Sequence, residues 1–491
     1  MNATIKLTNI NATWIRVETD PGIIQELWER LSFDVPNAKF MSKFKRRLWD
    51  GKIHLLNKKN CTLHKGLSHY VESYAKDNGY NFIQESDNIS YSEKEANDFI
   101  SQTKWYNNGQ SIEPRDYQIE GIRRAITNPR YIALSPTASG KSLIIASIIK
   151  FYYDNDEGDI LLICPTTSLV EQMYSDICDY FPYWEPSNKI TRIYSGMVRE
   201  QKRIIISTWQ SIYDNPESWF HNFSVVIGDE THLYAAKEVS KLFDKCVNAH
   251  YRFGFTGTLS GQQLHQLQVE GLFGKAYSLT TTSKLIKEKK LADLNINVLV
   301  FSYSDITKKE LKIASWEDEV QFIISNEKRN RYIAKLAASL KGNTLILFSR
   351  VEAHGRIIFD LIQESTNKPV FFIFGGTETE IRESVRKSID NVDNAIIVAS
   401  SQIFSTGINI PTLKNIIFTH PSKSRVRTLQ SIGRVLRTSD KKSGPSVLFD
   451  LVDDLRYKNK NNYAYNHFKE RIKIYNEEDF EYQILDIKLE K

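Results

Sequence analysis

One short segment of the chain has the residue types that hold a nucleoside triphosphate. Residues 135–142 are Ser-Pro-Thr-Ala-Ser-Gly-Lys-Ser and lie between the apolar runs 131–134 and 143–149, which predicts a strand, a turn and a helix in succession. Amides at a helix N-terminus, one lysine and one hydroxyl can together hold the β- and γ-phosphates and a Mg²⁺. We call residues 135–142 the phosphate turn and expect it to bind ATP. The predicted contacts are Thr137, Ala138, Ser139, Gly140, Lys141 and Ser142, the last also as a Mg²⁺ ligand.

Two carboxylates at the end of another apolar run are the first partner of this turn. Residues 225–232 are Val-Val-Ile-Gly-Asp-Glu-Thr-His. Ligands of open α/β sheets bind at the carboxyl ends of the strands, where these side chains are expected. We therefore predict that Asp229 holds Mg²⁺ and that Glu230 polarises the attacking water. His232 is predicted to couple the site to a neighbouring domain.

A pair of arginines near the C-terminus is the second partner. Gln430, Arg434 and Arg437 are spaced i, i+4 and i+7, so on a helix they share one face. If the helix borders a cleft between two domains, both guanidinium groups reach the γ-phosphate only when the cleft closes. Such an arginine contributes ~10³ to 10⁵ in rate at phosphoryl-transfer sites.

The elements that must position these residues follow a regular βαβ rhythm. β-rich apolar runs occur at 131–134, 160–164, 204–207, 225–227 and 253–256, and again at 295–301, 344–348, 370–373, 395–399, 416–418 and 446–451. Helical patterns separate them, so we predict an α/β fold with two parallel sheets in tandem. The predicted domains are a small N-terminal α/β domain with a linker (1–100), two α/β domains (101–285 and 286–454) and a C-terminal helical tail (455–491).

Composition sets wider limits. With 491 residues, 41% hydrophobic and 25% charged, the chain resembles an ordinary globular enzyme of about three or four domains. Its net charge of +6 permits a polyanionic partner without demanding one. The four cysteines form no Cys-x-x-Cys pair, which argues against zinc and a disulfide framework. Because neither a signal peptide nor a membrane span is present, we expect a cytoplasmic protein without membrane association.

The order of these motifs resembles that of the superfamily 2 helicases, in which two RecA-like domains enclose ATP. Further matching segments are residues 114–118 (Pro-Arg-Asp-Tyr-Gln), 164–168 (Cys-Pro-Thr-Thr-Ser), 207–211 (Ser-Thr-Trp-Gln-Ser), 256–258 (Thr-Gly-Thr), 348–350 (Phe-Ser-Arg) and 405–411 (Ser-Thr-Gly-Ile-Asn-Ile-Pro). The resemblance implies that Arg115 and Gln118 contact adenine, that Gly407 contacts the nucleotide and that Thr256 and Thr258 couple hydrolysis to domain movement. The nucleic-acid contacts implied are Thr166, Thr167, Thr208, Ser349, Arg350 and Thr406.

Motif details resemble the DNA-acting DExH branch, and most closely the UvsW-type recombination and repair helicases of T-even bacteriophages. The segments that carry this likeness are 44–53, 207–211, 281–285 and 404–408. Segment 39–59 also contains eight Lys/Arg and one acidic residue, interleaved with Phe40, Phe44 and Trp49. We therefore expect Lys45, Arg46 and Arg47 to grip DNA phosphates, while Phe44 and Trp49 either stack on bases or belong to the core.

The resemblance implies an ATP-dependent motor that moves 3′ to 5′ and acts on DNA forks, Holliday junctions and R-loops in recombination and repair. The expected cofactors are ATP and Mg²⁺, and the expected partner is DNA, including RNA:DNA hybrids, bound by a monomer. Two alternatives stay open within the same class: an RNA helicase, and a double-strand translocase that does not separate strands. A third is a DNA-binding or annealing module without enzymatic activity.

Overall fold

In the computed structural model the chain divides into two compact units, residues 1–135 with 140–279 and residues 136–139 with 280–491. The structure describes residues 3–35, 37–86, 90–194, 201–234, 237–259, 262–377, 381, 384–385, 388–389, 392–401, 410–437, 442 and 444–489. None of the helices in these ranges is long and apolar enough to cross a membrane.

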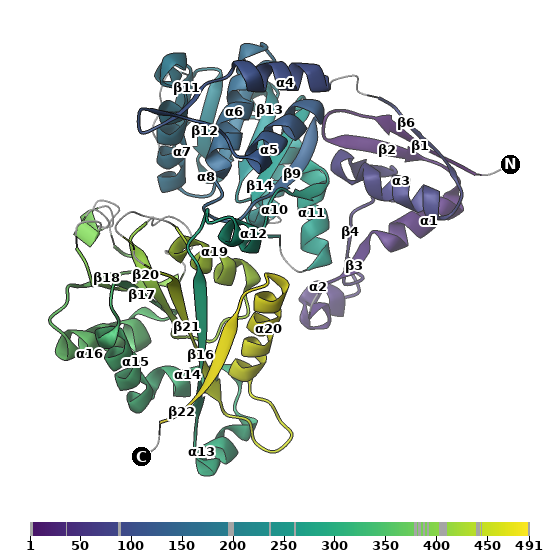
Figure 1. Ribbon diagram of the computed structural model, residues 1–491. Helices are drawn as coiled ribbons and strands as arrows, with labels where there is room; N and C mark the ends of the chain where they lie inside the picture. Colours follow the sequence, from purple (N-terminus) through teal and green to yellow (C-terminus); the bar gives the residue numbers. More distant parts are fainter. Residues whose placement is uncertain are drawn as a thin grey trace. The chain divides into compact units, whose positions relative to one another are not determined.

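The first unit begins with a four-stranded sheet of order β5-β2-β1-β6, and helices α1 and α3 lie along it (Figure 1). Its elements are β1 (Thr4–Asn9), β2 (Trp14–Glu18), α1 (Pro21–Arg30), β3 (Ser32–Asp34), α2 (Ser42–Lys45), β4 (Lys52–His54), β5 (Thr62–His64), α3 (Ser68–Asp77) and β6 (Asn81–Gln84). Alternate apolar side chains of β1 and β2 are buried against the helices. The short strands β3 and β4 form a separate antiparallel pair, and the loop between them contains most of the basic segment 39–59.

Buried polar contacts attach this N-terminal sheet to the rest of the first unit. The guanidinium of Arg252 is fully buried and donates to Thr13 Oγ1 at 2.6 Å and to the Cys246 carbonyl at 2.5 Å. His64 Nε2 lies 2.8 Å from Asp244 Oδ1, and Tyr70 donates to Glu270 at 2.7 Å. Burial and the hydrogen bond to Glu270 raise the pKa of Tyr70. Because removing one partner would leave a buried group unsatisfied, these contacts fix the sheet in place.

The sequence of residues 85–108 is polar and has no clear apolar face, which predicts a linker or a loosely packed connection, but the segment is partly helical. Ser92 and Glu95 form a capping box at the start of α4 (Glu93–Gln102). Ala96 is fully buried, and Phe99 and Ile100 pack against the same core. The prediction was wrong because these few residues are the whole apolar face of a short helix.

A parallel sheet of order β11-β12-β10-β13-β14-β9-β15 forms the centre of the first unit. Its elements, with the short strands that precede it, are β7 (Trp105–Asn107), β8 (Gln110–Ile112), α5 (Asp116–Thr127), β9 (Arg130–Leu134), α6 (Lys141–Asp154), β10 (Asp159–Cys164), α7 (Thr167–Tyr180), β11 (Ile190–Ile193), β12 (Ile204–Thr208), α8 (Trp209–Ile212), α9 (Glu217–Phe220), β13 (Phe223–Asp229), α10 (Lys237–Lys245), β14 (Tyr251–Thr256), α11 (Gln263–Phe273) and β15 (Ala276–Ser278). Alternate strand residues contribute to two apolar clusters, one with α5, α6 and α7 and the other with α10 and α11. Every strand predicted in this region is present.

The second unit contains another parallel sheet, of order β18-β19-β17-β20-β21-β16-β22. Its elements are α12 (Thr282–Lys287), β16 (Leu294–Ser302), α13 (Asp305–Glu310), α14 (Trp316–Ser325), α15 (Glu327–Ser339), β17 (Asn343–Phe348), α16 (Ile357–Ser365), β18 (Val370–Ile373), β19 (Ile396–Ser400), β20 (Leu413–Phe418), α19 (Arg425–Val435), β21 (Ser446–Asp454), α20 (Tyr463–Glu477) and β22 (Tyr482–Lys488). The two parallel sheets confirm the predicted tandem of RecA-like domains.

The C-terminal segment contributes more than the predicted helix. α20 packs on β21, where Arg471 donates to Asp450 at 2.9 Å beneath the helix. β22 then pairs in parallel with β16 over seven residues, from Ile296 with Tyr482 to Ser302 with Lys488. β22 is therefore an integral part of the second sheet, and α20 is packed against that sheet.

Candidate functional site

The phosphate turn has the strand, turn and helix that the sequence predicted. β9 ends at Leu134 and α6 begins at Lys141, with Gly140 as its N-cap residue at φ +79°. A Cβ on Gly140 would lie 2.4 Å from Gln118 Nε2, so only glycine fits there without displacing that amide. Ala138 also has a positive φ of 67°. Left-handed residues within a turn let neighbouring backbone amides point toward one concave side, which suits a phosphate.

Lys141 and Glu230 meet beside this turn. Lys141 Nζ donates to the Ser135 carbonyl at 3.2 Å and lies 4.0 Å from Glu230 Oε1. Both side chains are largely buried, with 12% and 20% of their surface exposed. The cation that would bind phosphate and the carboxylate that would orient water therefore occupy one site.

Asp229 is the last residue of β13, and its carboxylate is buried. Its Oδ1 accepts a hydrogen bond from the Glu230 amide at 2.9 Å. Burial and then the negative charge of Glu230 raise the pKa of Asp229 to about 7, although Lys141 and the hydrogen bond from the Glu230 amide favour the ionised carboxylate. Burial and the neighbouring carboxylate therefore both disfavour the ionised form of Asp229.

These residues fit a Mg²⁺ bound together with a nucleotide. Asp229 supplies a carboxylate oxygen, and Ser142 at the start of α6 supplies a hydroxyl that here lies 2.9 Å from the Tyr180 hydroxyl. Across the described residues no group of three or more His, Cys, Asp or Glu side chains could hold a metal. A Mg²⁺ here would need oxygens from phosphates and water to complete its shell, as is usual for this ion.

His232 connects the carboxylates to the neighbouring strand. Its Nδ1 lies 2.9 Å from Thr256 Oγ1 and 3.3 Å from Glu230 Oε2. Thr256 Oγ1 in turn donates to the Thr258 carbonyl at 3.1 Å. The residues predicted to couple hydrolysis to movement therefore form one continuous chain of contacts from Glu230. His265 on α11 lies beside His232, and burial lowers the pKa of His265.

Gln118, one of the two residues predicted to contact adenine, is buried in the first unit. Gln118 is 5% exposed; its Oε1 accepts from the Arg115 amide at 2.8 Å and its Nε2 donates to the Gly140 carbonyl at 3.2 Å. Arg115 also donates to the Tyr117 hydroxyl at 2.8 Å. Gln118 therefore links the start of α5 to the phosphate turn, and its contact with adenine stays a prediction.

The predicted arginine pair lies in the second unit. Gln430 and Arg434 are on α19, whereas Arg437 lies beyond Val435, the last residue of the helix. All three side chains are half-buried. The three residues therefore share one helical face only in part, because the chain leaves the helix toward β21 after Leu436.

The predicted nucleic-acid contacts of the first unit gather at one edge of its sheet. Cys164 of β10 pairs with Thr208 of β12, so the two strands end side by side. Thr166 caps α7 by accepting from the Leu169 amide, and Thr208 precedes α8 with its hydroxyl 2.8 Å from Ser211 Oγ. Thr167 is the first residue of α7. Helix N-termini with hydroxyls of this type are suited to backbone phosphates.

In the second unit, two predicted contacts follow β17. Ser349 is exposed, and Arg350 donates to Gln321 and Glu317. Thr406 and Gly407 lie outside the described residues.

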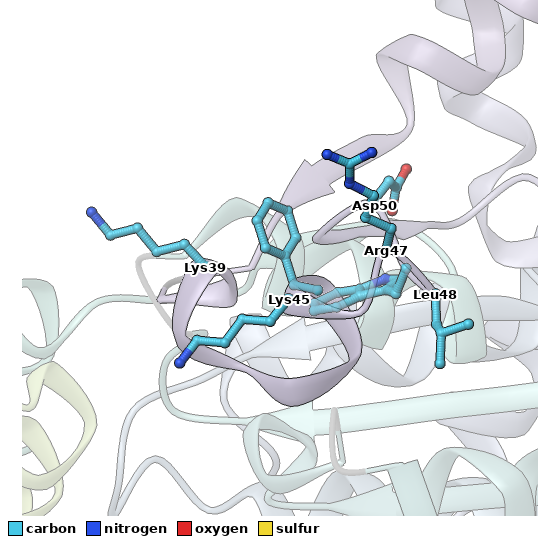
Figure 2. A pocket seen from close by; sticks show the side chains of 7 residues that line it. Lys39, Lys45, Arg47, Leu48 and Asp50 are labelled. Carbon is cyan, nitrogen blue, oxygen red and sulfur yellow. The ribbon is translucent and has the colours of Figure 1, made fainter.

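Residues 39–48 of the basic segment 39–59 are exposed on the first unit. A groove of about 690 Å³ is lined by Lys39, Lys45 and Arg47 together with Phe44 and Leu48. Figure 2 shows Lys39 and Lys45 extending to one side while Leu48 points to the other. Arg46 is exposed as well. Sequence reasoning found this surface from its charge, but did not find Tyr180, His265 or Leu48, which have no motif of their own.

Three models of known protein families match parts of the chain. The N-terminal model of the DNA helicase UvsW matches residues 4–85, a model of the type III restriction enzyme res subunit matches residues 111–261, and the helicase conserved C-terminal domain matches residues 327–439. The DNA 3′-5′ translocase XPB2 of Sulfurisphaera tokodaii is 24% identical over 381 residues, covering 70% of this chain and 82% of that protein.

The ATP-dependent DNA helicase uvsW of Enterobacteria phage T4 is 32% identical over 498 residues, which cover 97% of this chain and 98% of that protein. The crystal structure of T4 UvsW matches with a TM-score of 0.52 at 30% identity, over 99% of this chain and all of that one. Since the likeness includes the N-terminal sheet as well as both parallel sheets, the chain belongs to the UvsW family of ATP-dependent DNA helicases.

Proposed function

We propose that this protein is a DNA motor that moves 3′ to 5′ on one strand and remodels forks, four-way junctions and R-loops, including RNA:DNA hybrids. One observation carries the proposal: Lys141, Asp229 and Glu230 gather at the strand ends of a unit that also presents an exposed basic segment. The 3′ to 5′ direction is supported by the similarity to XPB2, which is described as a DNA 3′-5′ translocase. The proposed domains are an N-terminal DNA-binding domain (1–100), two motor domains (101–285 and 286–454) and a C-terminal segment (455–491).

In the proposed cycle the first motor domain binds the nucleotide. Lys141 and the amides of the phosphate turn hold the phosphates, and Asp229 and Ser142 would hold a Mg²⁺, which would neutralise charge on the phosphates. Glu230 orients the attacking water and accepts its proton. Gln430, Arg434 and Arg437 then contact the γ-phosphate when the second motor domain approaches. His232 and Thr256 couple hydrolysis at Glu230 to movement in the rest of the unit through their contacts.

The DNA path proposed follows the sheet edges. Thr166, Thr167 and Thr208 hold backbone phosphates on the first motor domain, and Ser349, Arg350 and Thr406 hold them on the second. Such contacts fix position without selecting sequence, as a motor that moves along DNA requires.

Exchange of the three basic residues tests the DNA grip. Replacing Lys45, Arg46 and Arg47 together by alanine should weaken DNA binding and reduce the slope of log affinity against log salt by roughly 2 to 3, because each phosphate contact contributes roughly 0.7 to 0.9. Nucleotide binding should not change. An unchanged salt slope would show that these three residues do not contact DNA phosphates and are ordinary solvent-exposed side chains.

A double-strand translocase that leaves strands paired is the second candidate, and the match to the type III restriction enzyme res subunit favours it. ATP turnover measured with single-stranded DNA, linear duplex, forked DNA, four-way junctions and RNA:DNA hybrids separates the two. The helicase proposal expects strand separation or branch migration with forks and junctions. Stimulation by linear duplex with no product strand released would favour the translocase.

A further inference from the structure

Tyr180, the last residue of α7, contacts a side chain that is proposed to bind Mg²⁺. Its hydroxyl lies 2.9 Å from the Ser142 hydroxyl, which is on the second residue of α6. The two residues are 38 positions apart in the sequence, and none of the helicase motifs includes Tyr180. Groups that hydrogen-bond to a metal ligand fix its orientation and so affect how tightly the metal is held.

Packing holds the Tyr180 ring in place. Tyr180 is half-buried, and its ring lies against the apolar cluster that contains residues of α5, α6 and α7. Its neighbours Ile177 and Phe181 are fully buried in the same cluster. The Phe181 amide donates to the Ile177 carbonyl at 3.1 Å and so closes the end of α7. The hydroxyl of Tyr180 therefore has little freedom to move away from Ser142.

The residues of β7 and the turn that follows it connect α6 and α7. Trp105 of β7 donates from its indole nitrogen to Ser147 Oγ on α6 at 2.9 Å. The Asn108 amide, directly after β7, donates to Asp179 Oδ1 on α7 at 2.8 Å. α6 and α7 also pack side by side (Figure 1). The helices that carry Ser142 and Tyr180 are thus joined by contacts besides the one between their hydroxyls.

A serine that binds a metal needs an acceptor for its proton. The serine hydroxyl has one proton and two lone pairs, and a metal ion takes a lone pair. Because Mg²⁺ requires nearly ideal octahedral geometry, the direction of that lone pair matters. A tyrosine hydroxyl keeps lone pairs that can accept a hydrogen bond while it is itself protonated. At 2.9 Å, Tyr180 Oη is within hydrogen-bond distance of Ser142 Oγ and can accept this proton.

We propose that Tyr180 is a positioning residue of the Mg²⁺ site: its hydroxyl accepts a hydrogen bond from Ser142 and thereby directs a serine lone pair toward the metal. This inference rests on the proposed function, in which Ser142 and Asp229 hold Mg²⁺, and adds the residue that orients one of these ligands. Tyr180 acts through Ser142 alone. Its removal should therefore lower the affinity for Mg²⁺ and leave the phosphate contacts of Lys141 intact.

The test is the full-length variant Tyr180→Phe, which removes one oxygen and keeps the ring. Its affinity for a fluorescent, non-hydrolysable ATP analogue is measured in excess EDTA and over a series of Mg²⁺ concentrations. In EDTA the affinity should stay within about twofold of the wild type, because Lys141 and the amides of the phosphate turn still hold the phosphates. The Mg²⁺ concentration that gives half of the gain in affinity should rise roughly 5- to 100-fold, as expected when a metal ligand loses its hydrogen-bond partner.

ATP turnover should show the same separation. The Mg²⁺ concentration that gives half of the maximal rate should rise by a similar factor in Tyr180→Phe. The rate at saturating Mg²⁺ should stay within about threefold of the wild type, because the groups that act on the γ-phosphate and the water are unchanged. A purely structural role of Tyr180 would instead lower the maximal rate and the EDTA affinity together.

Two further variants show whether the effect passes through Ser142. Tyr180→Phe added to Ser142→Ala should cause no further loss of Mg²⁺ dependence, because the hydroxyl through which Tyr180 acts is already absent. Tyr153→Phe is the matched control. It removes a phenolic oxygen from α6, where the Tyr153 ring packs on Trp184 with 5.3 Å between ring centres, and should behave as the wild type.

The opposite results would overturn the proposal. An unchanged Mg²⁺ dependence of Tyr180→Phe would do so, and so would equal losses in EDTA and in Mg²⁺. A lower Mg²⁺ requirement would show that the tyrosine hydroxyl competes with the metal for Ser142. Additive losses in the double variant would show that Tyr180 acts by another route. A wild-type protein whose ATP affinity does not respond to Mg²⁺ would refute the metal site of the proposed function itself, which is a distinguishable result.

Discussion

Asp229→Asn is expected to stabilise the protein while it stops the motor. The rise of the Asp229 pKa from 3.8 to about 7 means that the folded chain disfavours the ionised carboxylate, chiefly through burial and then through Glu230. Three pKa units correspond to roughly 4 kcal/mol. Asparagine keeps the acceptor for the Glu230 amide and carries no charge, so we expect a gain of roughly 1 to 4 kcal/mol in the free energy of unfolding above pH 7.

The pH dependence of this gain follows from the direction of the shift. Below about pH 4 the Asp229 carboxyl is protonated in both the folded and the unfolded chain, so its burial does not destabilise the fold through charge. Between about pH 4 and pH 7 the folded chain keeps a proton that the unfolded chain releases, so stability falls as pH rises. Above the pKa of the folded state, the carboxylate is ionised in both states and the loss in the free energy of unfolding is complete. The advantage of the Asp229→Asn variant should therefore grow from pH 4 to pH 7 and then stay constant.

Chemical denaturation at pH 5 and pH 8, without nucleotide and with a chelator, measures this difference. Asp98→Asn, at an exposed position on α4, is the matched control and should leave the stability of the first unit unchanged. The variant should also lose ATP turnover in the presence of Mg²⁺. A loss of stability at pH 8, or a gain that does not depend on pH, would refute the reasoning about the buried charge.

Further substitutions probe the site and the attachment of the N-terminal sheet. Glu230→Gln should retain ATP binding and lose turnover, whereas Lys141→Ala should lose both; nucleotide binding and phosphate release distinguish them. Gly140→Ala should lower ATP affinity at least tenfold and stability by roughly 1 to 3 kcal/mol, because φ is +79° and the new Cβ meets Gln118 Nε2 at 2.4 Å; adding Gln118→Ala should restore part of the loss. Thr256→Val, which removes the partner of His232 Nδ1, should keep basal turnover but reduce the DNA unwound per ATP consumed, and proportional losses would argue against coupling. Arg252→Met should destabilise the first unit by roughly 2 to 5 kcal/mol because Thr13 and the Cys246 carbonyl lose a buried partner, as denaturation can show.

The parts of the fold that sequence predicts best are those whose signal is local. β9, β10 and β13 are continuous apolar runs because their residues are buried on both faces of a parallel sheet. The phosphate turn is recognisable because a glycine, a lysine and a hydroxyl must follow such a strand directly. Edge strands carry a weaker signal: β22 is mostly exposed, and its sequence after Asp479 offers no continuous apolar run.

Contacts between distant segments that no motif marks could not be predicted. Ser142 and Tyr180 meet only because α6 and α7 pack together, and nothing in either helix sequence specifies that contact. Gln118 was assigned to adenine from its motif, yet its amide is bonded to the backbone of Arg115 and Gly140. The basic segment was predicted from charge, but which of its aromatic side chains project into solvent depends on how the loop packs on Gly51.

Phosphate release measured with and without forked DNA, for the wild type and for Glu230→Gln, tests the central claim most directly. The account predicts that forked DNA stimulates the wild type severalfold or more and that strand separation accompanies hydrolysis. Glu230→Gln should bind the same DNA and release no phosphate above background. Turnover by Glu230→Gln at the wild-type rate, or a wild-type rate that DNA leaves unchanged, would contradict an ATP-driven DNA motor built on this site.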